Sequence, residues 1–207
     1  MRVPVANEGW PFIFPPAAAA CILAVMGWWV AASLASVLAL VFLGFFRDPE
    51  RRPPDVSGAV VAPADGKVME VEAADDAWVG SAMRLSIFLS PLDVHVNRAP
   101  VAASVAGVEY KAGKFLAAYR PEASDVNERC TLTLAGSAHV AVRQIAGVLA
   151  RRIVCRVRTG DTLERGERYG LIRFGSRTDL FVPCASDIRV RVGDRVRGGE
   201  TIMALLP

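Results

Sequence analysis

The sequence has few histidines and cysteines and little net charge. It holds two histidines and four cysteines in 207 residues, and its net charge is only +3. No basic stripe with interleaved aromatic residues occurs, which argues against a nucleic-acid partner. No cysteines are paired at zinc or redox spacing, so we expect no metal and, instead, reduced, buried thiols in a domain facing the cytosol. The cysteines are Cys21, Cys130, Cys155 and Cys184.

Charge is missing over a long stretch near the N-terminus. No charged residue lies between Glu8 and Arg47, a run of 38 residues. A single helix of that length would exceed the ~30 Å hydrocarbon core of a bilayer. The run therefore predicts either one span, about Ala24 to Phe46, after a shallow entry segment, or a helical hairpin. The hairpin has Phe12 to Met26 as one arm, Gly27 to Trp29 as its bend and Val30 to Phe46 as the second arm.

Basic residues flank the uncharged run on both sides, with Arg2 before it and Arg47, Arg51 and Arg52 after it. Positive charge on both flanks favours the hairpin, with both ends on the cytoplasmic side. A cleaved signal peptide is the alternative, but the run is too long and no Ala-x-Ala-like site ends it. We therefore expect residues 1–47 to form a membrane-associated helical segment at the cytoplasmic face of the cell (inner) membrane, either crossing or dipping into the bilayer.

A polar, proline-rich linker, Asp48 to Pro54, separates this segment from the rest, because no helix or strand runs through such a sequence. Beyond it, short Val- and Ile-rich runs alternate with Gly and Asp-Gly turns, which predicts a mainly β sandwich or barrel over residues 48–207. We expect 147–153 to form a short helix or loop. The expected strands are 59–62, 67–72, 84–89, 102–110, 130–134, 139–145, 155–158, 171–174, 180–182 and 188–192.

Two segments of this part resemble turns of biotinyl and lipoyl carrier domains. Ala62 to Val68 is similar to their opening strand and turn, and Val192 to Glu200 to their Gly-Asp-x-Val-x-x-Gly-Glu turn. A carrier needs an exposed lysine at a hairpin tip, and Lys67 lacks that context. We interpret both segments as structural, lipoyl-like turns; a membrane-tethered, non-catalytic adaptor of this type is one alternative function.

The pair Gly175-Ser176 is a candidate site of backbone self-cleavage. The Ser176 hydroxyl can attack the Gly175 carbonyl, where no side chain obstructs it, and convert the peptide into an ester. Elimination and hydrolysis would leave a pyruvoyl group at residue 176 and release residues 176–207 as a small chain. Because Gly-Ser pairs are common in turns, this interpretation depends on the rest of the sequence.

His95 and Asp65 are the candidates for proton transfer. His95 lies in a polar segment after an apolar strand, and histidine is the natural general base near neutral pH. The alternative is a turn histidine that binds only backbone. An Asp that orients a His, which in turn activates a Ser, is a recognised arrangement in any chain order, and Asp65, His95 and Ser176 fit it. His139 is expected to face solvent or to pack in a strand.

Several motifs, taken together and in order, resemble the short bacterial and archaeal form of the phosphatidylserine decarboxylases over nearly the whole chain. They are Arg47-Asp48-Pro49, Ala62-Pro63-Ala64-Asp65-Gly66, Leu89-Ser90-Pro91-x-Asp93-x-His95, Gln144-Ile145-Ala146-Gly147, Ala150-Arg151-Arg152-Ile153 and Arg173-Phe174-Gly175-Ser176-Arg177. The resemblance implies a proenzyme that cuts itself at Gly175-Ser176. The products would be a β chain, 1–175, and an α chain, 176–207, which begins with the covalent pyruvoyl cofactor.

In this resemblance Ser176 matches the cleavage serine, Asp65 the activating aspartate and His95 the first histidine. Longer members carry a second histidine three residues later, cast as the charge-relay base, where this chain has Arg98. Either His95 therefore serves both maturation and decarboxylation, or another group is the base for cleavage. The implied reaction converts phosphatidylserine to phosphatidylethanolamine through a Schiff base between the pyruvoyl ketone and the headgroup amine, with His95 returning a proton.

The implied partners are phosphatidylserine in the membrane and the α and β chains of one precursor, with a homo-oligomer left open. The substrate's phosphate and carboxylate need cationic partners. The candidates are Lys114, Arg151, Arg152, Arg173 and Arg177. A pyruvoyl decarboxylase for another amine substrate is the second alternative, and the long uncharged run argues against a soluble one.

Overall fold

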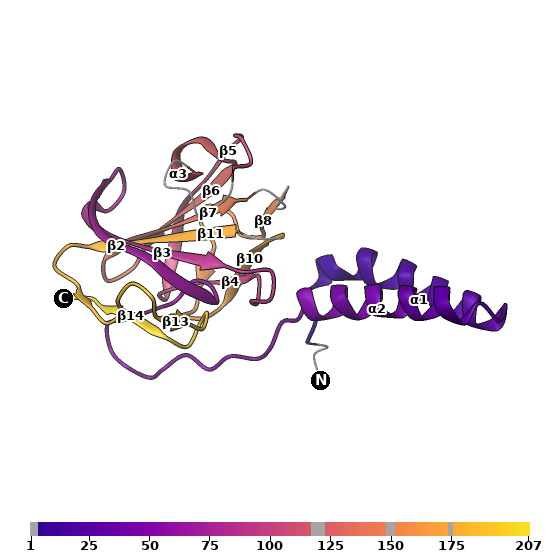
Figure 1. Cartoon of the computed structure of the whole chain (residues 1–207). Helices are drawn as coiled ribbons and strands as arrows, with labels where there is room; N and C mark the ends of the chain where they lie inside the picture. The colour runs from indigo at the N-terminus through magenta and orange to yellow at the C-terminus, as the bar shows by residue number, and fades with distance from the viewer. Residues whose placement is uncertain (1–3, 117–122, 148–151, 174–175) are drawn as a thin grey trace. The chain divides into compact units, whose positions relative to one another are not determined.

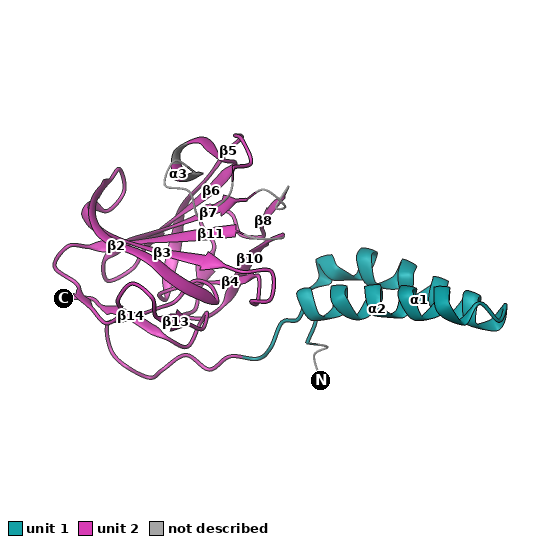
Figure 2. Ribbon diagram, viewed as in Figure 1, with its two compact units in different colours: residues 1–50 teal, residues 51–207 magenta. Residues whose placement is uncertain are grey.

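The computed structural model describes residues 4–116, 123–147, 152–173 and 176–207. The chain forms two compact units, residues 1–50 and residues 51–207. The first unit is helical, and the described regular elements of the second are strands apart from one short helix (Figure 2).

The first unit is a helical hairpin. A 3-10 turn, η1 (Asn7–Gly9), leads into α1 (Trp10–Val25), and α2 (Trp29–Phe45) returns beside it (Figure 1). The chain reverses at Gly27, whose φ of 78° is readily adopted only by glycine. Phe12 packs against Phe42 and Phe46 at the open end of the hairpin. The predicted hairpin is confirmed to within two residues, and the alternative of one helix over 24–46 is wrong.

Large apolar side chains cover the outside of this hairpin. Val25, Trp29 and Val30 are each at least 70% exposed, and exposed apolar surface of this extent marks a membrane or protein contact. The segment Asn7–Val25, with a mean hydropathy of 1.4, is the one helix among the described residues long and apolar enough to cross a membrane. An apolar helix of this kind can anchor the chain in a bilayer.

The second unit contains three antiparallel sheets (Figure 1). The largest is curled and has eight strands in the order β13-β2-β3-β11-β7-β6-β5-β9. Its strands are β2 (Gly66–Asp76), β3 (Gly80–Leu89), β5 (Ala103–Lys111), β6 (Arg129–Ala135), β7 (His139–Ala146), β9 (Thr162–Leu163), β11 (Ser176–Pro183) and β13 (Arg195–Val196). The two smaller sheets are β1-β14-β12, formed by Ala59–Val61, Ile202–Leu205 and Asp187–Ile188, and β4-β10-β8, formed by Val96–Arg98, Arg168–Ile172 and Ile153–Cys155. A short helix, α3 (Ala123–Val126), precedes β6.

The core lies on the inner face of the curled sheet. Alternate residues of β6 are buried, and two of them, Leu132 and Leu134, pack with Leu85, Val142 and Leu180 of neighbouring strands. This period of two is what places one apolar face of each strand inside. The mainly β fold is confirmed, and the two carrier-like turns lie side by side, because Gly66 and Lys67 pair with Val196 and Arg195.

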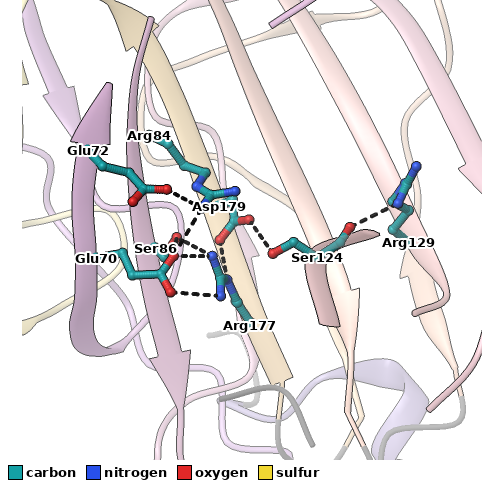
Figure 3. A network of polar contacts seen from close by, with 8 residues as sticks. All are labelled: Glu70, Glu72, Arg84, Ser86, Ser124, Arg129, Arg177 and Asp179. Carbon is teal, nitrogen blue, oxygen red and sulfur yellow. Dashed lines mark hydrogen bonds and ion pairs between the residues drawn. The ribbon is translucent and has the colours of Figure 1, made fainter. Parts of the chain in front are cut away.

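The strand β11 carries a buried ionic network (Figure 3). Its residues Arg177 and Asp179 lie on the face opposite to Ser176, because side chains alternate along a strand. The Arg177 guanidinium donates to Asp179 Oδ1 at 2.6 Å, to Glu70 Oε2 at 2.6 Å and to Ser86 Oγ at 2.7 Å. Ser124 of α3 donates to the other Asp179 oxygen at 3.2 Å. Burial alone would lower the pKa of Arg177, but the charges of Asp179 and Glu70 outweigh it and raise that pKa. The network thus ties β11 to β2, β3 and α3.

We predict that Arg177→Met strongly destabilises the protein. The substitution leaves the fully buried Asp179 carboxylate without its cation, which typically costs about 3–5 kcal/mol. Thermal unfolding of the full chain in detergent should therefore shift downward by roughly 10 °C. The matched control is Arg189→Met, which breaks the exposed pair with Asp187 and should cost less than ~1 kcal/mol. Equal effects of the two substitutions would show that the buried network does not hold the sheet.

Candidate active site

Ser176 is the first residue of β11 and lies inside the protein. It pairs with Leu89 of β3 on one side and with Ala146 of β7 on the other. Its side chain is fully buried, and its hydroxyl has no hydrogen-bond partner among the described residues. A buried hydroxyl without a partner is costly and therefore points to a functional requirement. The preceding residue of the expected cleavage site, Gly175, lies outside the described residues.

His95 stands directly before β4 and is 2% exposed. Its ring Nδ1 lies 2.9 Å from the Asp93 carbonyl oxygen. Because a carbonyl only accepts, Nδ1 is the donor, and the neutral ring then presents Nε2 as an acceptor, the form needed in a general base. The His95 carbonyl accepts from the Ile172 amide at 3.2 Å, which ties this segment to the end of β10, the strand that leads toward Ser176.

Asp65 lies in the turn before β2, where both carboxylate oxygens are bound. Arg51 donates to Oδ2 at 2.8 Å, and the Gly198 amide donates to Oδ1 at 2.7 Å. Arg51 also binds Glu200 at 2.8 Å. Burial opposes ionisation of Glu200, but Arg51, with smaller contributions from the Arg52 backbone and the charge of Arg197, lowers the pKa of Glu200. These contacts join the linker to the two carrier-like turns. The expected role of Asp65, to orient His95, stays a prediction.

Two buried amides connect β4, which follows His95, to β7 and to β11, the strand of Ser176. Asn97 of β4 donates to the Pro63 carbonyl and to Thr178 Oγ1, both at 3.3 Å. Gln144 of β7 donates to Asn97 Oδ1 at 2.8 Å. The sequence analysis named neither as a site residue. Gln144 could have been found from the sequence, because it continues the alternation of the inward-facing residues Val140 and Val142 along β7.

A third amide, that of Asn127, holds the backbone beside Ser176. Its Nδ2 donates to the Ala146 carbonyl at 2.7 Å and to the Leu116 carbonyl at 2.8 Å, and its Oδ1 accepts from the Leu116 amide. Ala146 is the β7 residue that pairs with Ser176. Asn127 therefore fixes the segment around Leu116 against the strand next to the candidate nucleophile.

Comparison with known proteins shows the family of this chain. The family model described as phosphatidylserine decarboxylase matches residues 38–204. A protein of Symbiobacterium thermophilum named phosphatidylserine decarboxylase proenzyme is 50% identical over 100% of this chain and 98% of that protein. Proteins of the same name from Desulfotalea psychrophila and Nitrosomonas europaea are 44% and 42% identical, over 98% and 97% of this chain and 96% and 94% of theirs. The chain belongs to the phosphatidylserine decarboxylase family.

Family membership confirms the resemblance seen in the sequence. It also places the chain among decarboxylating enzymes, so the alternative of a non-catalytic adaptor is wrong. The relatives are named as proenzymes, that is, as precursors of processed enzymes.

The expected cationic residues lie in different surroundings in this member of the family. Lys114 and Arg152 are exposed, and the partly buried Arg173 donates its amide to the Arg152 carbonyl at 3.3 Å. Arg151 lies outside the described residues. The position of Arg177 argues against the expected role in substrate binding, because its guanidinium is fully buried and bound to Asp179 and Glu70.

Two thiols, Cys130 of β6 and Cys155 of β8, interact with each other next to the strand position of Gln144. Cys130 is buried and pairs in register with Gln144, whereas Cys155 is partly exposed. A hydrogen bond from the Cys130 thiol lowers the pKa of Cys155 to about 7, although burial opposes this shift. The same hydrogen bond, together with burial, raises the pKa of Cys130. The pair thus makes Cys155 the more reactive thiol.

We predict that alkylation of Cys155 by iodoacetamide rises with pH to a half-maximal rate near pH 7, because the thiolate is the reacting form. Peptide mass spectrometry after short pulses of reagent measures this rate, with the exposed Cys184 as the reference in the same sample. Cys130→Ala removes the donor and should move the midpoint upward. A midpoint that does not change in this variant would refute the assigned hydrogen bond.

Proposed function

We propose that this chain is the precursor of a phosphatidylserine decarboxylase that cuts itself at Gly175-Ser176 and then converts phosphatidylserine to phosphatidylethanolamine. The observation that carries the proposal is the buried Ser176 hydroxyl without a hydrogen-bond partner in the described structure, at the first position of a central strand. The names of the relatives support the same substrate.

The cleavage begins with attack of Ser176 Oγ on the carbonyl carbon of Gly175. The bond from Oγ to that carbon forms, the bond from the carbon to the Ser176 nitrogen breaks, and the hydroxyl proton ends on the nitrogen. Elimination of the resulting ester frees the carboxylate of residue 175. Hydrolysis of the dehydroalanine then releases ammonia and leaves the pyruvoyl group at residue 176.

The buried position of Ser176 fits a residue that becomes a covalent cofactor. A pyruvoyl group supplies a ketone that condenses with a primary amine and accepts electrons as carbon dioxide departs. In our proposal the pairing of residue 176 with Leu89 and Ala146 holds this position in the fold. The apolar core on the same face keeps bulk water away from it.

His95 is the proposed proton donor and acceptor of the site. It is the only buried histidine, since His139 is exposed at the start of β7 and stacks on Trp78. With Nδ1 bound to the Asp93 carbonyl, Nε2 can take up a proton and later return it to the substrate's α-carbon. Arg98 cannot replace a second histidine in this role, because a guanidinium stays protonated.

The proposed headgroup site uses cations that remain accessible. Lys114 and Arg152 are exposed, and Arg173 is hydrogen-bonded through its backbone to Arg152. Guanidinium groups match the geometry of phosphate and carboxylate. We propose that these residues bind the anionic groups of the headgroup, and we leave out Arg177.

The helical hairpin is proposed to hold the enzyme at the cytoplasmic face of the cell membrane. Its exposed apolar surface suits the bilayer, and a substrate that never leaves the bilayer favours an enzyme that stays there. The 16 residues of α1 and 17 residues of α2 extend about 24–26 Å, which is less than the ~30 Å hydrocarbon core. Only the first arm, extended by η1 to Asn7–Val25, is long enough to cross, and the shorter second arm favours a hairpin that dips into the membrane.

We predict that Ser176→Ala yields an uncut and inactive chain, because it removes the attacking oxygen. A denaturing gel reports cutting, and release of carbon dioxide from headgroup-labelled phosphatidylserine in detergent reports activity. Ser186→Ala is the matched control, since this buried hydroxyl also has no partner in the described part of the chain but lies ten residues further on. Normal processing of Ser176→Ala would refute the proposed cleavage site.

We predict that His95→Gln lowers decarboxylation by about 100-fold or more, the usual loss when a proton-transfer group is removed. Glutamine can keep a hydrogen bond to the Asp93 carbonyl, so the local fold should survive. His139→Gln at the exposed position is the control and should retain activity. If His95→Gln turned over labelled phosphatidylserine as fast as the wild type, His95 would have no part in the reaction.

A further inference from the structure

Four buried polar side chains, one of them that of Ser176, form a cluster in the interior, and the orientation of its two amides follows from their neighbours. Asn97, Gln144, Ser176 and Thr178 are each no more than 1% exposed. They come from β4, β7 and β11, and they form the polar end of the otherwise apolar core. Buried polar groups are normally paired, so the unpaired atoms of this cluster carry information.

The orientation of the Asn97 amide is fixed by the Pro63 carbonyl. A backbone carbonyl only accepts, so Asn97 must turn its Nδ2 toward Pro63, and the same nitrogen reaches Thr178 Oγ1. The Asn97 Oδ1 therefore faces Gln144.

That orientation fixes the Gln144 amide in turn. Because Asn97 Oδ1 only accepts, Gln144 must present its Nε2, and the two atoms lie 2.8 Å apart. Its Oε1 then points away from Asn97, and no donor reaches this buried oxygen within the described ranges. The absence of a side chain at Gly170 leaves room for Nε2, since a Cβ there would lie 3.2 Å from it. The chain thus holds an amide acceptor in one orientation with nothing bound to it.

The matching donor is on the adjoining strand. Gln144 pairs with Thr178, and Ala146 pairs with Ser176, so Gln144 and Ser176 are diagonal neighbours on one face of the sheet. Such neighbours have Cβ atoms within the reach of a long side chain. Ser176 Oγ is a buried donor with no acceptor among the residues the structure describes, and Gln144 Oε1 is a buried acceptor with no donor there.

We propose that Gln144 is a positioning residue for self-cleavage: during the cleavage step its Oε1 accepts the hydrogen of the Ser176 hydroxyl, a bond that is not formed in the described structure, and so orients the attacking oxygen. Asn97 holds Gln144 in the required orientation. The hydrogen bond itself transfers no proton, so the atoms and bonds of the cleavage step balance as before. This inference rests on the proposed function, because it assigns a task within the same cleavage.

The test measures the rate at which newly made full-length chain becomes two chains, by pulse-labelling during cell-free synthesis with detergent or vesicles. Gln144→Met keeps the length of the side chain but removes the acceptor, and we expect cleavage to slow by about 10-fold or more, as for a lost buried hydrogen bond. Equal rates of Gln144→Met and wild type would overturn the inference.

A double-substitution experiment separates positioning from a merely structural role. In Ser176→Cys the nucleophile is a thiol, which is a weak hydrogen-bond donor, so adding Gln144→Met should slow its cleavage much less than it slows the wild type. A general disturbance of the fold would slow both backgrounds equally, and that result would overturn the inference.

Tyr169→Phe is the matched control, because the Tyr169 hydroxyl is another buried group without a partner in the described structure and lies on β10. We expect it to cleave at the wild-type rate. If it slowed cleavage as much as Gln144→Met, the acceptor would serve Tyr169 and the inference would fail. A wild-type chain that never cleaves would instead overturn the proposed function, and this inference with it.

Discussion

The pairing of β11 with β3 and β7 is the constraint on which the candidate site depends. Eight consecutive residues, Ser176 to Pro183, pair with β3, and six of them also pair with β7. One face of this strand carries Ser176 into the core, and the other carries Arg177 and Asp179 into a buried ion pair. A strand held on both edges and both faces has little freedom, so the first residue of β11 is fixed even though a cut in the chain is proposed directly before it.

The pairing of β11 with β7 also buries the polar side chains of Ser176 and Gln144 at one end of the core. An apolar residue at position 144 or 176 would pack without the desolvation cost of an unpartnered polar atom, which is about 1–3 kcal/mol for each group. Natural sequences retain such groups mainly where function requires them. The amides of Asn97 and Gln144 come from other strands and lie at the same end of the core. The unpartnered polar atoms therefore lower the stability of the fold at the position where the chemistry is proposed.

The sequence predicted those features that depend on one local pattern. The absence of charge over 38 residues gave the helical hairpin, and runs of Val and Ile gave most strands. It placed the start of β11 four residues too late, at Leu180, because Ser176 to Asp179 are polar. The hydrogen-bond partners that stabilise the buried Arg177, Thr178 and Asp179 come from β2, β3, β4 and α3. For the same reason Arg177 was taken for a substrate ligand. Asn97 and Gln144 were missed because their roles depend on contacts between strands far apart in the chain.

The measurement that tests the central claim most directly is the intact mass of the purified protein, before and after treatment with cyanoborohydride and an amine. The account predicts two chains, residues 1–175 and residues 176–207, with the smaller one lacking a free amino terminus and gaining mass on treatment because its terminal ketone reacts. A single chain with the mass of all 207 residues, unchanged by the reagents, would contradict the account.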